Sequence, residues 1–390
     1  MYENIKTLED VDFNGKKVLL RVDYNVPLDA KGNILDDFRI RASIPTIKTI
    51  LKKGASQIII MTHFGRPKNK ESVFKTDILS QKLHIFLGRS VEKLDDCIDL
   101  EHVFPSPEES KLVMLENLRF SELEILNDDG FAKKLAKHAD IYVNDAFGVC
   151  HRKHASVHAI TKYIPGCVGL LVEKELKIFT EILSNPQRPF TGILGGAKLE
   201  TKIPVIKNLI DKVDNLLIGG GMIFTFYSAM GYYVGRSMVD KSNESLAKML
   251  LNNEKLVVPE DVVIADDMAN PSQIINSSPD KIPSYMLGLD IGEKALANFK
   301  NILDSSKTVI WNGPLGYYEN PLFAKTTNEL LEFLANSSAK VIIGGGDTAA
   351  IVEKLGLKDK FHHVSTGGGA SMMLLEGSVL PAIKALKDNN

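Results

Sequence analysis

The sequence has little cysteine, no long apolar run and almost no net charge. Its 390 residues include 3 cysteines, and their positions, Cys97, Cys150 and Cys167, fit neither a CxxC metal site nor a disulfide framework. This usage favours a reducing, cytoplasmic environment. We expect no signal peptide, because the N-terminus lacks a basic segment followed by an apolar one. We expect no membrane-spanning helix, because no run of about 20 apolar residues occurs.

The formal net charge is −2, from 47 Lys+Arg against 49 Asp+Glu. A general nucleic-acid binder needs a basic field to hold phosphates, so this balance argues against nucleic acid as a partner. It leaves room for a local basic site. Hydrophobic residues make up 44% and charged residues 25% of the chain, as in ordinary globular proteins, so disorder is not the expected main state.

Three common motifs are also missing. There is no GxxxxGK[ST] loop, and the glycines at 219–221 are followed by Met222, Ile223 and Phe224, so GxGxxG fails as well. No GxSxG nucleophile elbow occurs. These absences argue against a P-loop NTPase and a standard dinucleotide dehydrogenase.

Short apolar runs rich in β-branched residues recur between helix-like stretches such as 41–54 and 128–140. The runs are 16–26, 57–63, 112–118, 141–148, 190–196, 215–221, 261–266, 308–313, 340–346 and 362–369. They lack clean alternation, which is typical of strands covered on both faces, so their order predicts an α/β protein with parallel sheets.

The number of expected strands exceeds what one doubly wound domain usually contains, so we expect two domains. The segment 171–189 carries apolar residues at helical spacing and is predicted to be a helix that joins two lobes. We place an N-terminal lobe over 1–170, a connecting helix over 171–187 and a C-terminal lobe over 188–377.

Ligands of open α/β sheets bind beyond the carboxyl ends of the strands. In the first half the residues after the runs are polar and basic, and Arg39 and Arg41 follow the first run closely. The residues after the runs are Arg21, Asp23, Tyr24 and Asn25, then His63, Phe64, Gly65 and Arg66, then Glu116, Asn117 and Arg119, then Asn144, Asp145, His151, Arg152, Lys153 and His154. Together they predict an anion pocket, because guanidinium groups donate in pairs to phosphate and carboxylate. The alternative is that each arginine is a surface charge or pairs with a nearby Asp.

In the second half the corresponding residues are glycines, at 195–196, 219–221, 344–346 and 367–369. Glycine lets backbone N–H groups approach a phosphate at a helix N-terminus, so these positions predict a nucleotide site. The alternative is that they are merely tight turns.

Three polar residues accompany the glycines. Asp347 would hold Mg²⁺ on a nucleotide, cap a helix, or do both. If the segment is helical, Lys198 and Lys202 lie on one face, where they would reach a phosphate or simply face solvent.

A metal site formed by His151, His154 and His158 is disfavoured, because no carboxylate follows in a zincin pattern. A basic pocket in one half and a nucleotide site in the other predict phosphoryl transfer to or from a small acidic substrate, with domain closure.

The chain closely resembles the phosphoglycerate kinase family in a set of motifs that follow the family's order over nearly the whole chain. They are RVDYNVPLD (21–29), DDFRI (36–40), THFGRP (62–67), LENLRF (115–120), NDAFGVCHRKHAS (144–156), GILGGAKLETKI (192–203), IGGGMIFTF (218–226), WNGPLGYYE (311–319), IGGGDTAA (343–350) and STGGGASMMLLEG (365–377). The resemblance implies two Rossmann-like three-layer lobes with parallel sheets, joined by a helix and separated by a cleft, with 378–390 returning to the first lobe. It also implies reversible transfer between 1,3-bisphosphoglycerate and Mg·ADP, giving 3-phosphoglycerate and ATP, in glycolysis and gluconeogenesis. The transfer would be direct and in-line after hinge closure, in a cytoplasmic monomer.

The resemblance also assigns residue roles. By similarity, the triose substrate binds Asp23, Tyr24, Asn25, Arg39, His63, Phe64, Gly65, Arg66, Arg119 and Arg152. The nucleotide binds Lys202, Glu319, Gly345, Gly346, Asp347 and Thr348, with Glu319 on the ribose and Asp347 on Mg²⁺ through the nucleotide. Arg39 and Lys198 match the family's catalytic pair, which stabilises charge on the transferred group.

A few positions depart from the family pattern. Thr326 stands where the family often has Gly, Tyr317 and Tyr318 replace a usually smaller residue and Phe, and Cys150 stands where Ala is common. Two other readings stay open. A catalytically dead nucleotide-binding scaffold would require a lost catalytic residue, and a dehydrogenase would require the missing fingerprint.

Overall fold

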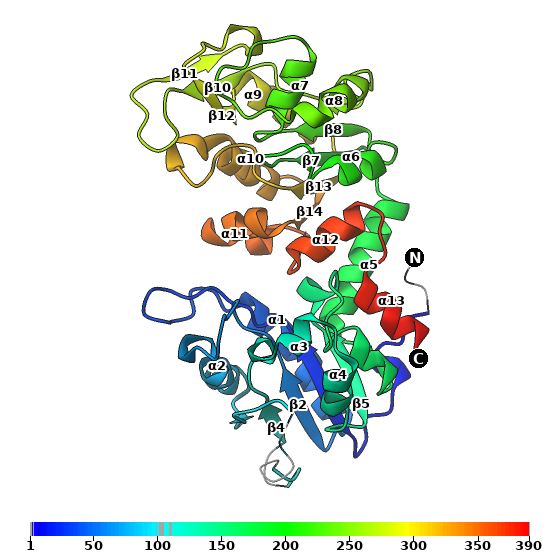
Figure 1. Ribbon diagram of the computed structural model, residues 1–390. Helices are drawn as coiled ribbons and strands as arrows, with labels where there is room; N and C mark the ends of the chain where they lie inside the picture. The colour runs from blue at the N-terminus through cyan, green and yellow to red at the C-terminus, as the bar shows by residue number, and fades with distance from the viewer. Residues whose placement is uncertain (1, 3, 99, 101–104, 109–110, 390) are drawn as a thin grey trace. The chain divides into compact units, whose positions relative to one another are not determined.

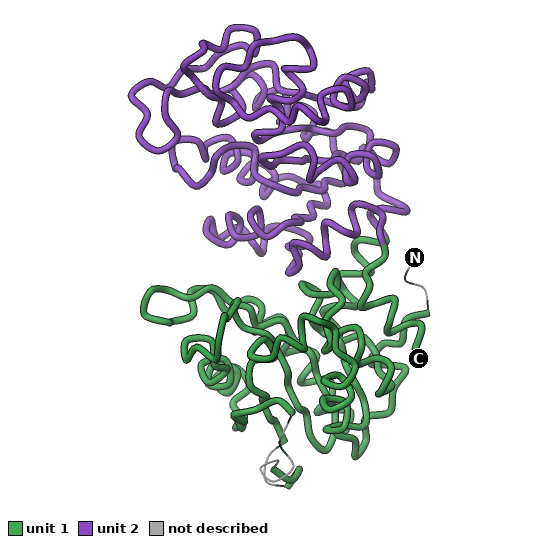
Figure 2. The backbone as a smooth tube through the Cα atoms, viewed as in Figure 1, with its two compact units in different colours: residues 1–180, 379–390 green, residues 181–378 purple. Residues whose placement is uncertain are grey.

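The computed structural model describes residues 2, 4–98, 100, 105–108 and 111–389. The chain folds into two compact units, shown in Figure 2. Unit 1 consists of residues 1–180 and 379–390, and unit 2 of residues 181–378. The division falls inside helix α5 (Leu170–Ser184), within the segment predicted to connect the lobes. The C-terminal residues belong to unit 1, where the backbone N–H of Leu380 donates to the Tyr2 hydroxyl at 3.1 Å.

Among the described residues, the sheet of unit 1 has six strands in the order β3-β4-β2-β1-β5-β6, and every pair is parallel. The strands are β1 (Lys17–Val22), β2 (Gln57–Met61), β3 (Glu92–Lys93), β4 (Leu112–Met114), β5 (Ile141–Asp145) and β6 (Gly166–Val168). Because all of them run the same way, their carboxyl ends meet at one edge, and the polar residues after the runs meet there too.

Both faces of this sheet are buried, as the unalternating apolar runs predict. Val18, Leu20 and Val22 of β1 pack in one core cluster with residues of two helices, α1 and α2, while Leu19 and Arg21 point to the other face and are equally buried. The helices are α1 (Phe38–Lys52), α2 (Asp77–Leu87), α3 (Glu122–Ile125), α4 (Asp129–Ala136), α5 and α13 (Pro381–Asp388), as Figure 1 shows. Helix α1 begins three residues before the predicted stretch, which puts Arg39 in its first turn.

Unit 2 contains two sheets. Its parallel sheet has the order β15-β14-β13-β7-β8-β9. The strands are β7 (Phe190–Leu194), β8 (Asn215–Ile218), β9 (Leu256–Val257), β13 (Thr308–Asn312), β14 (Lys340–Gly344) and β15 (His363–Val364). The helices are α6 (Ile203–Leu209), α7 (Ile223–Ala229), α8 (Glu244–Leu250), α9 (Glu293–Asp304), α10 (Lys325–Ala335), α11 (Gly346–Lys354) and α12 (Gly368–Leu375).

One of the predicted strands of unit 2 does not join the parallel sheet but a separate sheet of three strands. The run 261–266 forms β10 (Val262–Ala265), which pairs antiparallel with β11 (Ile274–Ser277) and β12 (Leu287–Ile291). The expectation of a parallel strand at this run was therefore wrong. The link from β10 to β11 is too short for the crossover that parallel neighbours need, so the chain turns back in a hairpin. Within the described part of the chain, no helix is long and apolar enough to cross a membrane.

Candidate active site

At the basic strand edge of unit 1, an ion pair joins the first strand to the first helix. Arg39 Nη1 donates to Asp23 Oδ2 at 2.7 Å. Burial would raise the pKa of Asp23, but the charge of Arg39, aided by those of its basic neighbours, brings that pKa down to about 2. Arg39 therefore has the carboxylate partner that the alternative reading expected. Its side chain is still 29% exposed, so the guanidinium also reaches the surface.

His63 lies between this ion pair and a buried arginine. Arg21, which is fully buried, donates from Nη2 to His63 Nδ1 at 3.2 Å, so Nδ1 accepts and the ring proton sits on Nε2. His63 is 3% exposed, and burial lowers its pKa well below the ordinary value. His63 Nε2 lies 3.8 Å from Asp23 Oδ1. At neutral pH, His63 is therefore a neutral hydrogen-bond donor in a fixed tautomer.

Arg21 shows what the sequence could not reveal about this edge. It follows the same pattern as the other basic residues, but its Nε donates to Ser156 Oγ at 2.8 Å, and Nη2 lies 3.9 Å from Glu124 Oε1. Arg21 thus positions His63 from behind and does not face a ligand. Arg21 lies inside β1, whereas Asp23 follows the strand's last residue, Val22, and this difference separates the two.

Arg119 is the centre of an excess of positive charge. Its Nη1 donates to the carbonyl of Gly65 at 2.6 Å, and the Gly65 N–H donates to Asn25 Oδ1 at 2.9 Å. Burial, together with the charges of Arg152 and Arg21, lowers the pKa of Arg119 to about 10. Arg119 Nε is buried with no hydrogen-bond partner. Crowded like charges and an unsatisfied donor are the features of a site that an anion completes.

The remaining predicted residues of this edge fall into two groups. Arg66 is exposed, and Arg152 is half-buried with its Nε 3.1 Å from His151 Nε2. Tyr24 and Phe64 belong to the core cluster: the Tyr24 hydroxyl lies 2.6 Å from Ser43 Oγ, and Phe64 packs edge-on against Phe74. Their side chains do not face the edge, so only their backbones are available to a ligand there.

The glycines of unit 2 are not equivalent. A Cβ at Gly195 would overlap the carbonyl oxygens of Gly313 and Pro314, and one at Gly220 would lie 2.5 Å from the Gly196 nitrogen. These glycines let two backbone segments touch, which is the tight-turn reading. Gly346, in contrast, has nothing within 4 Å of an added Cβ.

The open position at Gly346 is the start of α11. Gly345 is its N-cap with φ 90°, so the helix begins at Gly346, and Asp347 lies in the first turn. Asp347 is therefore not the N-cap, contrary to one of the two readings. The Thr348 hydroxyl accepts the N–H of Gly313 at 2.8 Å and ties this turn to the end of β13. A helix N-terminus that opens onto free space suits a phosphate group.

Lys202 and Lys198 have opposite environments. Lys202 is buried and donates from Nζ to Asn312 Oδ1 at 2.6 Å. Burial lowers its pKa to about 8, although the carboxylates of Asp347 and Glu376 oppose that shift. Lys198 is exposed, and α6 begins only at Ile203. The two lysines would share one helix face only if the segment were helical, and this condition is not met, because the chain between them is a turn.

The carboxylates of two predicted nucleotide residues, Glu319 and Asp347, both affect the pKa of Tyr318. Burial raises the pKa of Tyr318, and the carboxylates of Asp347 and Glu319 raise it further. Among the described residues, no group of three or more His, Cys, Asp or Glu side chains could hold a metal ion alone. Asp347 at an open helix N-terminus fits a Mg²⁺ whose other ligands are phosphate oxygens.

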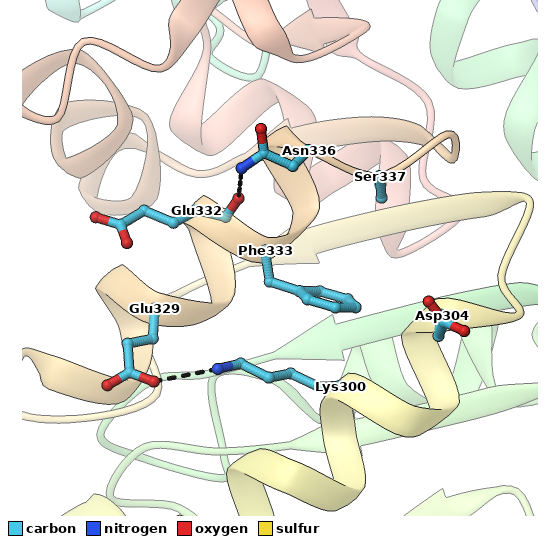
Figure 3. A pocket seen from close by; sticks show the side chains of 7 residues that line it. All are labelled: Lys300, Asp304, Glu329, Glu332, Phe333, Asn336 and Ser337. Carbon is cyan, nitrogen blue, oxygen red and sulfur yellow. Dashed lines mark hydrogen bonds and ion pairs between the residues drawn. The ribbon is translucent and has the colours of Figure 1, made fainter.

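A separate hollow of about 570 Å³ lies between α9 and α10 (Figure 3). Its lining residues are Lys300, Asp304, Glu329, Glu332, Phe333, Asn336 and Ser337. Lys300 Nζ donates to Glu329 Oε2 at 3.1 Å and joins the two helices. None of the predicted site residues lines this hollow, so it is not part of the candidate site.

Comparison with known proteins places the chain among similar sequences over nearly its full length. The family model described as phosphoglycerate kinase matches residues 8–378. A phosphoglycerate kinase of Dictyoglomus turgidum is 46% identical over 394 residues, covering 99% of both chains. One of Prochlorococcus marinus is 48% identical, covering 99% of this chain and 98% of its own. The solved structure of the phosphoglycerate kinase from Coxiella burnetii aligns with a TM-score of 0.87 and 34% identity, covering 98% of this chain and 99% of its own.

Proposed function

Because the chain belongs to the phosphoglycerate kinase family, we propose that its two strand edges each hold one substrate of that family's reaction. The protein is a phosphotransferase with a carboxyl group as acceptor, and it acts in glycolysis. Family members use ATP and ADP. We assign 3-phosphoglycerate and 1,3-bisphosphoglycerate to unit 1 and the nucleotide to unit 2.

The excess positive charge around Arg119 is the observation that carries the assignment of the triose. This substrate bears a phosphate and a carboxylate or acyl phosphate, and guanidinium groups bind both in pairs. Arg119 has an unpartnered buried donor, and the charge of Arg152 acts on it. Arg66 is exposed and directly follows Gly65, whose carbonyl accepts from Arg119. His63 adds a neutral donor, while Asp23 and Asn25 supply acceptors for the substrate's hydroxyl group.

The open N-terminus of α11 supports the assignment of the nucleotide. The N–H groups at Gly346, Asp347 and Thr348 would bind phosphate oxygens, Lys202 would add a charge, and Glu319 would accept from the ribose. Asp347 would hold Mg²⁺, which when bound to the nucleotide neutralises charge on the phosphate oxygens.

The reaction requires positioning of the substrates and positive charge, and it requires no general base. The attacking atom is an oxygen of a carboxylate or of a nucleotide phosphate that is already ionised, so no proton has to be removed. Arg39 and Lys198 would stabilise charge on the transferred group. Lys198 is exposed and free of a helix, and Arg39 lies in the first turn of α1. Direct in-line transfer requires the two substrates to meet, so approach of the two units belongs to the proposal.

A coupled assay tests this function directly. The purified chain with 3-phosphoglycerate, ATP and Mg²⁺ should produce ADP, and omission of any one of the three should abolish the signal. Absence of 3-phosphoglycerate-dependent ATP use by folded protein would disprove the proposal. We further propose that the enzyme is a cytoplasmic monomer; its three cysteines are free and buried, which favours a reducing compartment.

A further inference from the structure

Asp290, at the end of β12, is a buried carboxylate that none of the predicted roles uses. It is 3% exposed. Oδ1 accepts the hydroxyl of Thr326 and the N–H of Ile291, the latter at 2.9 Å, and Oδ2 accepts the N–H of Thr326 at 3.2 Å. Burial raises the pKa of Asp290 to about 7, although these hydrogen bonds oppose the rise. A carboxylate this buried is tolerated only where donors hold it.

Asp290 also takes the place of a missing helix cap. The N-cap of α10 is Ala324, whose side chain cannot accept a hydrogen bond, and Thr326 is one of the first residues of the helix. Oδ2 of Asp290 accepts one of the N–H groups that a helix start leaves unpaired. The pair Asp290–Thr326 therefore fixes the end of β12 against the start of α10.

The segment 313–319, which carries Glu319, lies against this junction. The N–H of Leu315 donates to Thr327 Oγ1 at 3.0 Å, and the N–H of Tyr317 donates to the Leu289 carbonyl at 2.7 Å. Between them, a Cβ at Gly316 would overlap Asp290 Oδ1. Leu315, Gly316 and Tyr317 thus contact α10, Asp290 and β12, respectively.

We propose that Asp290 and Thr326 are positioning residues for nucleotide binding: by clamping β12 to α10 they set the backbone of 313–319 and with it the carboxylate of Glu319. This inference rests on the proposed function, because it assumes that Glu319 contacts the nucleotide. Three residues after Thr326 on α10, Glu329 is a further carboxylate that raises the pKa of Asp290. Lys300 donates to Glu329 from α9 (Figure 3).

The test compares Thr326→Val with Thr326→Ser. Valine keeps the shape but removes the hydroxyl, so we expect the KM for Mg·ADP to rise about 3- to 10-fold while kcat and the KM for the triose stay within about twofold. Serine restores the hydroxyl and should restore the wild-type KM. Asp290→Asn is a second variant that should weaken the link between β12 and α10. In either orientation of the amide, its NH₂ group faces a backbone or hydroxyl donor and cannot accept a hydrogen bond from it.

Thr191→Val is the matched control for lost stability. Thr191 is a buried threonine of unit 2 whose Oγ1 lies 2.8 Å from Ser306 Oγ, near the amino end of β7. It should lower the melting temperature without changing the KM for Mg·ADP. The inference is overturned if the wild type is active and both Thr326→Val and Asp290→Asn bind Mg·ADP like the wild type, or if Thr326→Ser or Thr191→Val weakens binding equally. A wild type without 3-phosphoglycerate-dependent turnover overturns the proposed function instead.

Discussion

The two parallel sheets end in edges that provide positive potential by different means. In unit 1 the potential comes from side chains: Arg39, Arg119 and Arg152 carry full charges, and the buried Nε of Arg119 has no hydrogen-bond partner. In unit 2 it comes mainly from the backbone, at the open N-terminus of α11, with Lys202 as a buried charge beside it. A small substrate with two anionic ends suits the first, and a chain of phosphates suits the second.

This difference decides which substitutions each edge tolerates. Side-chain charges are removed by single substitutions that leave the backbone in place. Backbone donors can be changed only by altering the space around them, and the glycines that give close backbone contact are distinct from those that leave room for a ligand. The predictions below separate the two cases.

The largest effect is expected from removing the charges on the transferred group. Arg39→Ala and Lys198→Ala should each lower kcat about 10²- to 10³-fold, because their interaction strengthens in the transition state. The coupled assay measures kcat, and thermal unfolding checks that the fold survives. Arg41→Ala is the control in α1: Arg41 is 51% exposed and paired with Asp37, so its loss should leave kcat nearly unchanged. Near-normal turnover in both catalytic variants would contradict the assigned roles.

The next comparison is between two glycines of unit 2. Gly195→Ala forces a methyl group into the Pro314 carbonyl and should destabilise unit 2 by about 3 kcal/mol. Gly346→Ala has free space, so the melting temperature should hold while the KM for Mg·ADP rises about tenfold, or 1.4 kcal/mol, because the methyl fills the phosphate position. Thermal unfolding and titration with Mg·ADP measure the two effects. Equal stability losses in both variants would mean that Gly346 is only a turn residue.

The sequence predicted the architecture well and the local geometry less well. Apolar runs identified nine of the twelve strands of the two parallel sheets, because burial on both faces leaves a continuous apolar pattern. They missed β3, β6 and β9, which have only two or three residues each and so leave too short a pattern. They could not show that β10 turns back, since hairpin and crossover connections share the same strand pattern. Basic residues after the strands predicted an anion site, but not that Arg21 lies behind His63, because the apolar run 16–26 did not show that β1 ends at Val22. The clamp between Asp290 and Thr326 links residues 36 positions apart and leaves no local pattern.

The pH dependence should also differ between the two edges. The pKa of Lys202 is about 8 in the free protein, so its positive charge is present below that pH and is lost above it. The kcat/KM for Mg·ADP should therefore fall above pH 8, approaching tenfold per pH unit, because kcat/KM reports the free enzyme. The kcat/KM for 1,3-bisphosphoglycerate should stay flat to about pH 9, since guanidinium groups remain charged. Lys202→Arg should flatten the nucleotide profile; a profile unchanged by this substitution would assign the titration to another group.

The smallest signal is expected from the single tryptophan. Trp311 is fully buried in β13, and its Nε1–H donates to the Gly313 carbonyl at 2.7 Å, while the Gly313 N–H donates to Thr348 in the first turn of α11. A nucleotide bound at that turn would shift Gly313 and with it the environment of the indole. Mg·ADP should therefore change the tryptophan fluorescence more than 3-phosphoglycerate alone, and Thr348→Val, which breaks the link, should reduce the change at saturating Mg·ADP. A larger response to 3-phosphoglycerate would reverse the assignment of substrates to the two edges, because Trp311 belongs to unit 2 and the basic edge belongs to unit 1.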